Sequence, residues 1–214
     1  YEGTYKYEDF NTSVNEKGET VYKLKAGIPY YTANTQPGDP KYKNMDENLQ
    51  INDADKVAIG NGQPKHTGGF TNNFTYKNFD LNIFMTWSYG NDILNANRMI
   101  FENPSSKQNT NMFATYVNRW TESNPYSDMP RAKAQGAGEY SSLYVEDGSF
   151  LKLKNITLGY NFKPKTLHPL HISSARVYVS AENIATISSY SGSDPEVSTR
   201  NSVLTPGFDW SAYP

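Results

Sequence analysis

The residues of this chain that could bind an ion lie in one short polar segment, 44–55. Oxygen-bearing side chains recur there at positions 1, 3, 5, 9 and 12, and position 7 would offer its backbone carbonyl, which is the spacing of a calcium loop. The candidate ligands are Asn44, Asp46, Asn48, Gln50, Asn52 and Asp55. This pattern predicts a site for Ca²⁺, the one cofactor that the sequence suggests.

The same segment departs from a calcium loop at three positions. Asn44 replaces the first aspartate, Leu49 stands where the sharp turn needs glycine, and Asp55 replaces the last glutamate. Fewer charges and a strained turn weaken ion binding. Two interpretations therefore stay open: a weak calcium site, and a polar loop that is folded by Asx turns.

No other set of residues has the spacing of a catalytic site. The chain has no cysteine and only three histidines, which are scattered at positions 66, 168 and 171. The nearest carboxylate pairs, Glu146-Asp147 and Asp194-Pro195-Glu196, are interpreted as solvated loop charges. The aromatic residues that could stack on sugar rings (Tyr30, Tyr31, Tyr89 and Trp210) are interpreted as loop packing. The sequence therefore predicts that this protein is not an enzyme.

Composition narrows the class of protein. The 214 residues carry 20 basic and 22 acidic side chains, so no positive field favours nucleic acid. Hydrophobic residues are only 36% of the chain and mean hydropathy is -0.73, yet 14% are aromatic, 17 of them tyrosine. With 23 asparagines, this composition indicates a β-protein with long loops.

Four segments have the pattern of strands. After residues 70–76, a turn at 77–78 leads into 79–87, where apolar and polar residues alternate; this predicts a β-hairpin. Residues 149–162 and 174–187 predict a second strand pair around a short connection at about 163–173. In that pair, Leu151 and Leu153 alternate onto the polar side, while Lys152 and Lys154 fall on the apolar side with Ile156.

Between the two pairs, one helix is expected at 111–120. Met112, Tyr116 and Trp120 recur there at a helical spacing. Short connections at one end and long ones at the other are typical of outer-membrane barrels, and four strands cannot close such a barrel. The fold class expected is all-β: part of a large transmembrane antiparallel β-barrel, with a short helix in one loop.

This topology divides the chain into five segments. We expect extracellular loops at 1–58, which includes the degenerate calcium loop, at 90–147, which includes the helix, and at 188–214, which would precede a further strand. Barrel hairpins are expected at 59–89 and 148–187. The polar side that would face the barrel lumen carries Asp80, Asn82, Thr86, Asn155, Thr157, Arg176 and Glu182.

Several segments together resemble one family. Residues 38–92, 118–132, 144–160 and 176–198, followed by the final GFDWSAYP, are similar in sequence and order to the late barrel of SusC/RagA-type TonB-dependent outer-membrane transporters of Bacteroidetes. The loop at 44–55 departs from that family's usual D-x-N-x-D-G pattern.

The resemblance implies a whole protein with a 22-stranded barrel and an N-terminal plug in the bacterial outer membrane. It implies import of oligosaccharides or peptides, with a SusD-like lipoprotein as the lid and TonB engaged through a region outside these residues. The alternative is a soluble β-rich glycan-binding module of the cell surface. In such a module the apolar stretch Ile156–Phe162 would have to be covered, whereas in a barrel it would face lipid.

Overall fold

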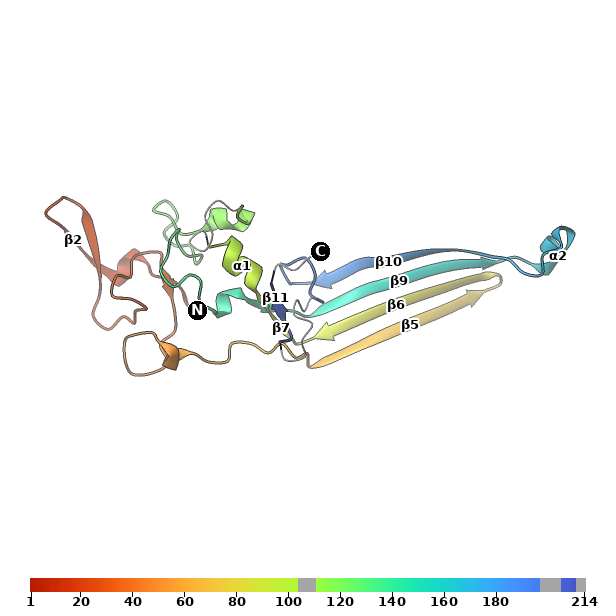
Figure 1. Ribbon diagram of the computed structural model, residues 1–214, viewed down its shortest axis with the longest axis horizontal. Helices are drawn as coiled ribbons and strands as arrows, with labels where there is room; N and C mark the ends of the chain where they lie inside the picture. Colours follow the sequence, from red (N-terminus) through yellow and green to blue (C-terminus); the bar gives the residue numbers. More distant parts are fainter. Residues whose placement is uncertain (104–110, 197–204, 211–214) are drawn as a thin grey trace. The chain divides into compact units, whose positions relative to one another are not determined.

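The computed structural model describes residues 1–103, 111–196 and 205–210. The chain divides into two compact units, each of which is described here by itself (Figure 1). Unit 1 comprises Tyr1–Gly60, Leu94–Val145 and Asp209–Pro214, and unit 2 comprises Asn61–Ile93 and Glu146–Phe208.

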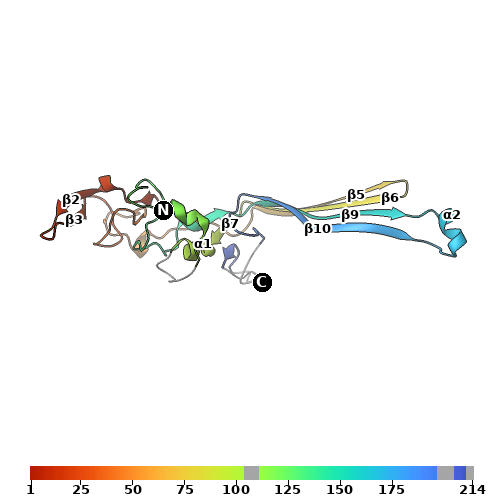
Figure 2. The ribbon, with the colours of Figure 1, turned by 90° about the horizontal axis from the view of Figure 1, so that it is seen from above.

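Unit 2 is built on one antiparallel sheet of four strands in the order β10-β9-β6-β5. Their bounds are β5 His66–Tyr76, β6 Phe79–Tyr89, β9 Phe150–Asn161 and β10 Arg176–Ser188. All four predicted strands are confirmed, with β5 beginning four residues earlier than its pattern suggested. Figure 2 shows them as one thin layer.

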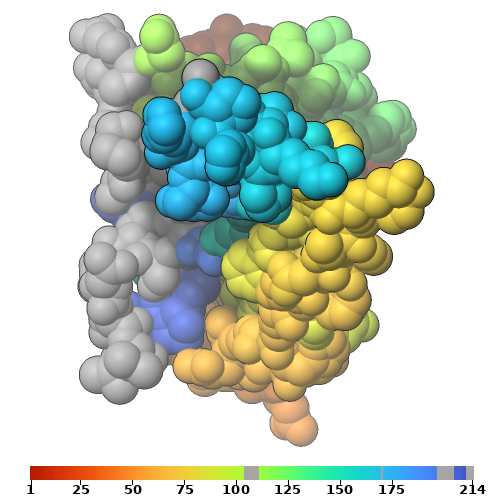
Figure 3. Space-filling model, turned by 90° about the vertical axis from the view of Figure 1, so that its right-hand side faces the viewer, coloured from red at the N-terminus to blue at the C-terminus, as the bar shows by residue number. Residues whose placement is uncertain are grey.

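Both short connections lie at the same end of this sheet. The β5–β6 turn is made by Lys77 and Asn78, with Lys77 in the left-handed region at φ 55°. The β9–β10 connection carries α2 (Pro164–Leu167) and the 3₁₀ turn η5 (His168–Leu170). Figure 3 looks onto this end, with the α2 connection in cyan beside the yellow hairpin turn. The opposite end of the strands therefore takes the long connections.

A β-bulge changes which face the start of β9 presents. Phe84 and Met85 are neighbours on β6, but their partners on β9 are Asn155 and Leu153, so Lys154 is the extra residue. Because side chains alternate along a strand, one inserted residue reverses the faces of everything before it. The prediction that Leu151 and Leu153 lie on the polar side was therefore wrong: they pair with Trp87 and Met85 on the apolar side.

Unit 1 consists of loops with short elements. It contains β1 Gly3–Thr4 paired with β4 Pro40–Lys41, the hairpin of β2 Phe10–Val14 and β3 Thr20–Leu24, the helix α1 Ala96–Phe101, and the 3₁₀ turns η1 Tyr7–Asp9, η2 Asp53–Asp55, η3 Ala114–Asn118 and η4 Ser142–Tyr144. The short strands β7 Asp92–Asn95, β8 Val145–Asp147 and β11 Phe208–Asp209 lie where the chain passes from one unit to the other.

Buried aromatic side chains and tyrosine hydroxyls hold the loops of unit 1. Tyr5 and Tyr144 are almost fully buried, and their hydroxyls donate to the carbonyls of Pro29 (2.6 Å) and Ala137 (2.8 Å). The Tyr42 hydroxyl donates in the same way to Gly136 (2.6 Å). Each ring supplies apolar area while its polar tip fastens a loop backbone. Three of the 17 tyrosines thus hold loop segments of unit 1.

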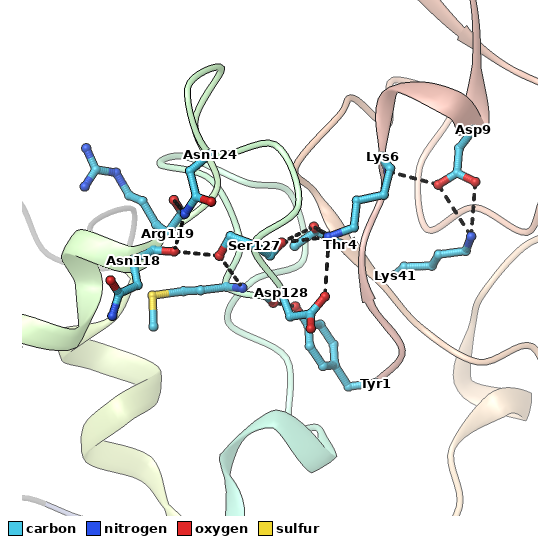
Figure 4. A network of polar contacts seen from close by, with 11 residues as sticks. Tyr1, Thr4, Lys6, Asp9, Lys41, Asn118, Arg119, Asn124, Ser127 and Asp128 are labelled. Atoms are coloured by element: carbon cyan, nitrogen blue, oxygen red, sulfur yellow. Dashed lines mark hydrogen bonds and ion pairs between the residues drawn. The ribbon is translucent and has the colours of Figure 1, made fainter.

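A second set of contacts fixes the amino-terminal segment of unit 1 (Figure 4). The ammonium of Lys6 donates to the Ser127 carbonyl (2.9 Å) and to Asp128 Oδ1 (3.3 Å), and the Thr4 hydroxyl donates to the same Ser127 carbonyl (2.6 Å). The Lys41 ammonium lies 3.3 Å from Asp9 Oδ1. Residues more than a hundred positions apart are thereby joined.

The helix expected at 111–120 is only the 3₁₀ turn η3. Tyr116 and Trp120 are buried as the pattern predicted, but Val117 is 76% exposed. Phe113 offers no side-chain cap at the start and Arg119 is extended at the end, so the helix does not propagate. The helix α1 was not predicted; the Asn95 side chain caps it by accepting from the Arg98 N–H. None of the described helices has the length and apolarity needed to cross a membrane.

Candidate functional site

The sheet of unit 2 has one apolar face. The facing residues form rows across the strands, such as Phe74, Leu81, Leu158 and Val179. Its members are Phe70, Phe74, Tyr76, Phe79, Leu81, Ile83, Met85, Trp87, Leu151, Leu153, Ile156, Leu158, Tyr160, Val177, Val179, Ala181, Ala185 and Ile187. We call this set the apolar face.

Much of the apolar face is exposed. Phe70 is 53% exposed, Leu158 46%, Val179 70% and Ile187 69%. Apolar patches of this extent on a protein surface mark contact with another protein or with lipid. The face is therefore a contact surface.

Aromatic side chains gather near both ends of the apolar face. Near the short connections, Phe79 packs against Tyr160 with ring centroids 4.8 Å apart, and Tyr160 against Phe162 at 5.1 Å. At the other end, the Trp87 indole N–H donates to His66 Nδ1 (3.2 Å), and His66 stacks on Tyr89. Transmembrane barrels carry such aromatic girdles at both interfaces.

The opposite face of the sheet is polar and hydrogen-bonded, as predicted for Asp80, Asn82, Asn155, Thr157 and Arg176. The Arg176 guanidinium crosses over β9 to form an ion pair with Asp80, and the Asn161 amide donates to the same carboxylate (2.9 Å). Gly159 lies beneath this ion pair. A Cβ there would come within 2.7 Å of both Arg176 and Asp80, so a side chain at this position would push the ends of these two flexible side chains aside.

Further along β9, the polar face carries a lysine cluster that the sequence assigned to the wrong side. Because of the bulge, Lys152 lies opposite Thr86 on the polar face, where its side chain is only 7% exposed. Its ammonium contacts Asp194 (2.7 Å) and Glu196 (2.9 Å), and Lys154 contacts the same Glu196 oxygen (2.6 Å). We call residues 194–196 the strap.

These acidic residues are loop charges, as expected, and their side chains are 43% and 44% exposed, but the sequence did not indicate that they pair with Lys152 and Lys154. Burial opposes the ionisation of Asp194, but hydrogen bonds from Lys152 and from the Glu196 backbone prevail and hold the pKa of Asp194 below its usual value. Lys154 and Lys152 lower the pKa of Glu196 in the same way, against the effect of burial. Glu146 is also bonded, accepting from the backbone N–H and the hydroxyl of Ser191 (2.8 Å each).

A hollow of about 550 Å³ opens beside the strap. Its lining includes Glu196 and Pro195 of the strap, Phe84 and Thr86 of β6, and Phe150 of β9. The hydroxyl of Thr86 has no hydrogen-bond partner among the described residues. Aromatic rings, hydroxyls and a carboxylate together are suited to a polar ligand with some apolar surface.

The predicted ion loop of unit 1 forms a chain of Asx turns. Asn44, Asp46 and Asn48 each accept from the backbone N–H two residues on, at 3.3, 3.0 and 2.8 Å. Asn52 accepts from the Ala54 N–H (2.8 Å) and also donates to the Gln50 carbonyl (2.8 Å). Side-chain oxygens thus stabilise the loop backbone directly, as the Asx-turn interpretation expected.

Asp55 closes this loop. Its two oxygens accept from the Met45 N–H (2.7 Å) and the Asn52 N–H (2.8 Å), and these backbone hydrogen bonds hold its pKa below the usual value. In the part of the chain that the structure describes, no three His, Cys, Asp or Glu side chains are grouped so as to hold a metal ion.

Comparison with known proteins gives the family. No family model matches the sequence. The chain is 34% identical to TonB-dependent receptor P3 of Formosa agariphila over an alignment of 193 residues, which covers 88% of this chain. It is 29% identical to TonB-dependent receptor SusC of Bacteroides thetaiotaomicron over 189 residues, and this alignment covers 86% of the chain. The structure matches the RagAB peptide importer in its closed-closed state with a TM-score of 0.58 and 26% identity over 86% of the chain. The chain belongs to the SusC/RagA-type family of TonB-dependent receptors.

The alignments cover most of this chain but only a small share of each relative. The chain spans 19% of the length of receptor P3, 17% of SusC and 18% of the matched RagAB chain. SusC and RagA are outer-membrane barrel proteins, so the four strands of unit 2 correspond to a portion of a TonB-dependent receptor barrel. Closure of a barrel is not seen among the described residues.

Sequence reasoning missed the most buried polar group of the SusC/RagA-type sheet, Lys152. One signal was present: two lysines, 152 and 154, interrupt an otherwise apolar face of the expected strand. Charged residues at alternate positions on an apolar face are costly, and a one-residue bulge resolves the conflict. The partners of Lys152 lie 42 and 44 positions away, and no sequence pattern indicated them.

Proposed function

We propose that this chain forms barrel wall and extracellular loops of a TonB-dependent transporter that imports oligosaccharides or peptides across the outer membrane. The observation that carries the proposal is the division of the sheet into an exposed apolar face and a hydrogen-bonded polar face. A transmembrane barrel needs lipid on one side and a polar lumen on the other.

Strand length supports this placement. A strand of 11 residues, such as β5 or β6, spans about 36 Å. When tilted by about 40°, it covers about 28 Å of the bilayer normal, close to the apolar band of an outer-membrane barrel. A soluble glycan-binding module would have to cover Leu158 and its neighbours, which are exposed here.

The transporter proposal includes two protein partners. RagAB is described as a peptide importer, and SusC/RagA-type transporters work with a SusD-like surface lipoprotein and with TonB. In this proposal the loops of unit 1 and the connections at 90–147 and 188–214 are extracellular, where the lipoprotein would contact them. The short connections at 77–78 and 162–175 would be periplasmic.

Cysteine labelling tests this orientation, because the chain has no cysteine of its own. Glu16→Cys lies in the β2–β3 connection and Lys165→Cys lies in α2; both native side chains are exposed. In whole cells that produce the receptor, we expect a membrane-impermeant maleimide to label position 16 and not position 165. Permeabilised cells should label both. Labelling of position 165 in intact cells would contradict the orientation.

Transport is tested separately, by deletion of the receptor gene in its own host. The deletion strain should lose growth on one class of oligosaccharide or peptide, and the intact gene should restore it. A soluble 24.1 kDa species in the wild-type extract would instead favour the glycan-binding module.

For the loop at 44–55, we propose that calcium is a minor stabiliser of an Asx-turn loop. Asp55 already closes the loop through two backbone N–H groups, so an added ion has little left to organise. Millimolar CaCl₂ should therefore change the melting temperature of the receptor little, whereas Asp55→Ala should lower the protease resistance of the loop. A large stabilisation by CaCl₂ that Asp46→Ala abolishes would contradict this and establish a true calcium site.

A further inference from the structure

The lysine cluster on the polar face has the composition of an anion site. Lys152 is 7% exposed and Lys154 27%, and both ammonium groups reach one carboxylate oxygen of Glu196. A buried lysine is stable only when anionic partners compensate its charge. Among the residues that the structure describes, that compensation comes from Asp194 and Glu196 of the strap.

The cluster adjoins an open space. Glu196 lines the hollow, and so does Thr86, which is the direct cross-strand partner of Lys152. The Thr86 hydroxyl lacks a partner among the described residues, as noted above. Neither lysine is part of the lining of the hollow, and a ligand there would meet the two ammonium groups once the strap carboxylates move away.

The strap is a short acidic segment of the chain. Its two carboxylates flank Pro195, and Asp194 also accepts from the Glu196 backbone N–H (2.8 Å). Two carboxylates face two lysines, so the charges balance. A ligand that carries a carboxylate could form the same ion pairs without leaving either lysine buried and unpaired.

We propose that Lys152 and Lys154 form a carboxylate-binding subsite of the hollow, occupied in this structure by the strap as a tethered stand-in for an acidic ligand. The ligand class is a substrate with a carboxylate, from an acidic sugar or from a peptide. This inference rests on the proposed transport function, since it assigns a substrate class to the polar face of the same barrel.

The strap should weaken ligand binding in the wild-type receptor. A tethered group competes at a high effective concentration, and the apparent affinity falls by the fraction of sites that are open. Asp194→Asn with Glu196→Gln keeps the size of both side chains but removes both charges. We therefore expect this double variant to bind acidic probes at least about tenfold more tightly than wild type.

The test is calorimetric titration of the receptor that carries this segment, purified in detergent. The acidic probes are trigalacturonate and triglutamate; their uncharged counterparts are maltotriose and triglutamine. Tighter binding of either acidic probe by the double variant, with its counterpart unchanged, supports the subsite and shows whether sugar or peptide supplies the carboxylate. Equal binding of acidic and uncharged probes by this variant would overturn the proposal.

A matched pair of further variants tests the role of Lys152. Lys152→Met, added to the double variant, leaves no strap carboxylate unpaired and should abolish the gain in affinity for the acidic probe. The control adds Lys165→Met instead. Lys165 is an exposed lysine beyond the other end of β9, and its replacement should leave the gain in affinity intact. Retained tight binding without Lys152 would overturn the assignment.

A second measurement uses a receptor whose ion pairs are intact. Pro195 is buried within the strap, so Pro195→Cys should react slowly with a maleimide and faster when a saturating acidic probe displaces the strap. An unchanged rate would also overturn the proposal. Either failure leaves the transport proposal standing if the receptor deletion still abolishes growth, so the two can be judged separately.

Discussion

At the residue scale, one ion pair of the polar face passes over a residue without a side chain. Gly159 has no side chain to block the Arg176–Asp80 ion pair, which passes directly over its Cα. The sequence gives no sign of this, because glycine in a strand usually weakens it or marks a bulge. Here it allows residues of β6 and β10 to meet across an intervening strand.

Gly159→Ala should therefore displace the Arg176–Asp80 ion pair with little loss of stability. The added methyl group meets only the ends of two flexible side chains, which can move aside, and exposed ion pairs contribute little to stability. Urea unfolding of the receptor in detergent measures the change. The matched control is Gly69→Ala on β5, where the nearest atom, on the Phe84 ring, lies at 3.3 Å. A much larger loss of stability at Gly159 than at Gly69 would contradict this account.

The strap gives a prediction about pH. Asp194 and Glu196 have pKa values below their ordinary 3.8 and 4.5, so their ionised forms stabilise the folded state. This stabilisation is complete above the ordinary values and is lost as the pH falls through the lowered ones. From about pH 5 to about pH 3, the melting temperature of wild type should fall more steeply than that of the Asp194→Asn, Glu196→Gln variant. Parallel curves would exclude a role for the strap.

At the scale of the element, the bulge at Lys154 sets which residues of β9 face each side. Period-two alternation located the four strands, because a half-buried strand needs little more than that pattern. It failed at Leu151, Leu153 and Lys152, because the alternation is reversed by one inserted residue that only the pairing with Phe84 and Met85 reveals. Tertiary pairing, rather than local preference, decided these positions.

Other elements show the same limit of sequence reasoning. Asparagine-rich spacing at 44–55 correctly suggested Asx turns, because these depend on neighbouring residues only. The helix predicted at 111–120 was too long. Tyr116 and Trp120 are buried at a helical spacing, but no continuous helix joins them. The partners of Lys152 could not be predicted from the sequence, because an ion pair to a loop residue leaves no periodic signal.

Deletion of Lys154 should remove the bulge and keep both faces of β9. Without it, Asn155 and Leu153 become neighbours, so Leu153 still lies opposite Met85 and Lys152 opposite Thr86. We therefore expect the deletion variant to assemble in outer membranes, as measured by heat-dependent mobility on gels. Deletion of Lys152 is the control: it would turn either Leu151 or Leu153 to the polar face, and it should reduce assembly. Loss of assembly without Lys154 would show that the bulge itself is needed.

At the scale of the whole molecule, the two faces of the sheet meet different media. Ala181 and Glu182 are adjacent on β10 but belong to opposite faces, since they pair with Ile156 and Asn155. They therefore offer a matched test of which face is exposed to lipid.

Ala181→Arg should impair folding in the membrane, whereas Glu182→Arg should not. An arginine on the lipid side near the middle of a barrel strand costs about 2–4 kcal/mol, while lumen positions tolerate charge. The yield of folded receptor in outer-membrane fractions measures the difference. Equal yields would mean that the apolar face does not contact the hydrocarbon of the membrane.

The tyrosine hydroxyls of unit 1 have a consequence for redox chemistry. Exposed loops are often held by disulfides, which need an oxidant to form. This chain has no cysteine, and the hydroxyls of Tyr5, Tyr42 and Tyr144 instead donate hydrogen bonds to loop carbonyls between 7 and 94 positions away. The fastening of these loops requires no electron acceptor. Unit 1 should therefore keep the same structure in strongly reducing surroundings as in oxidising ones.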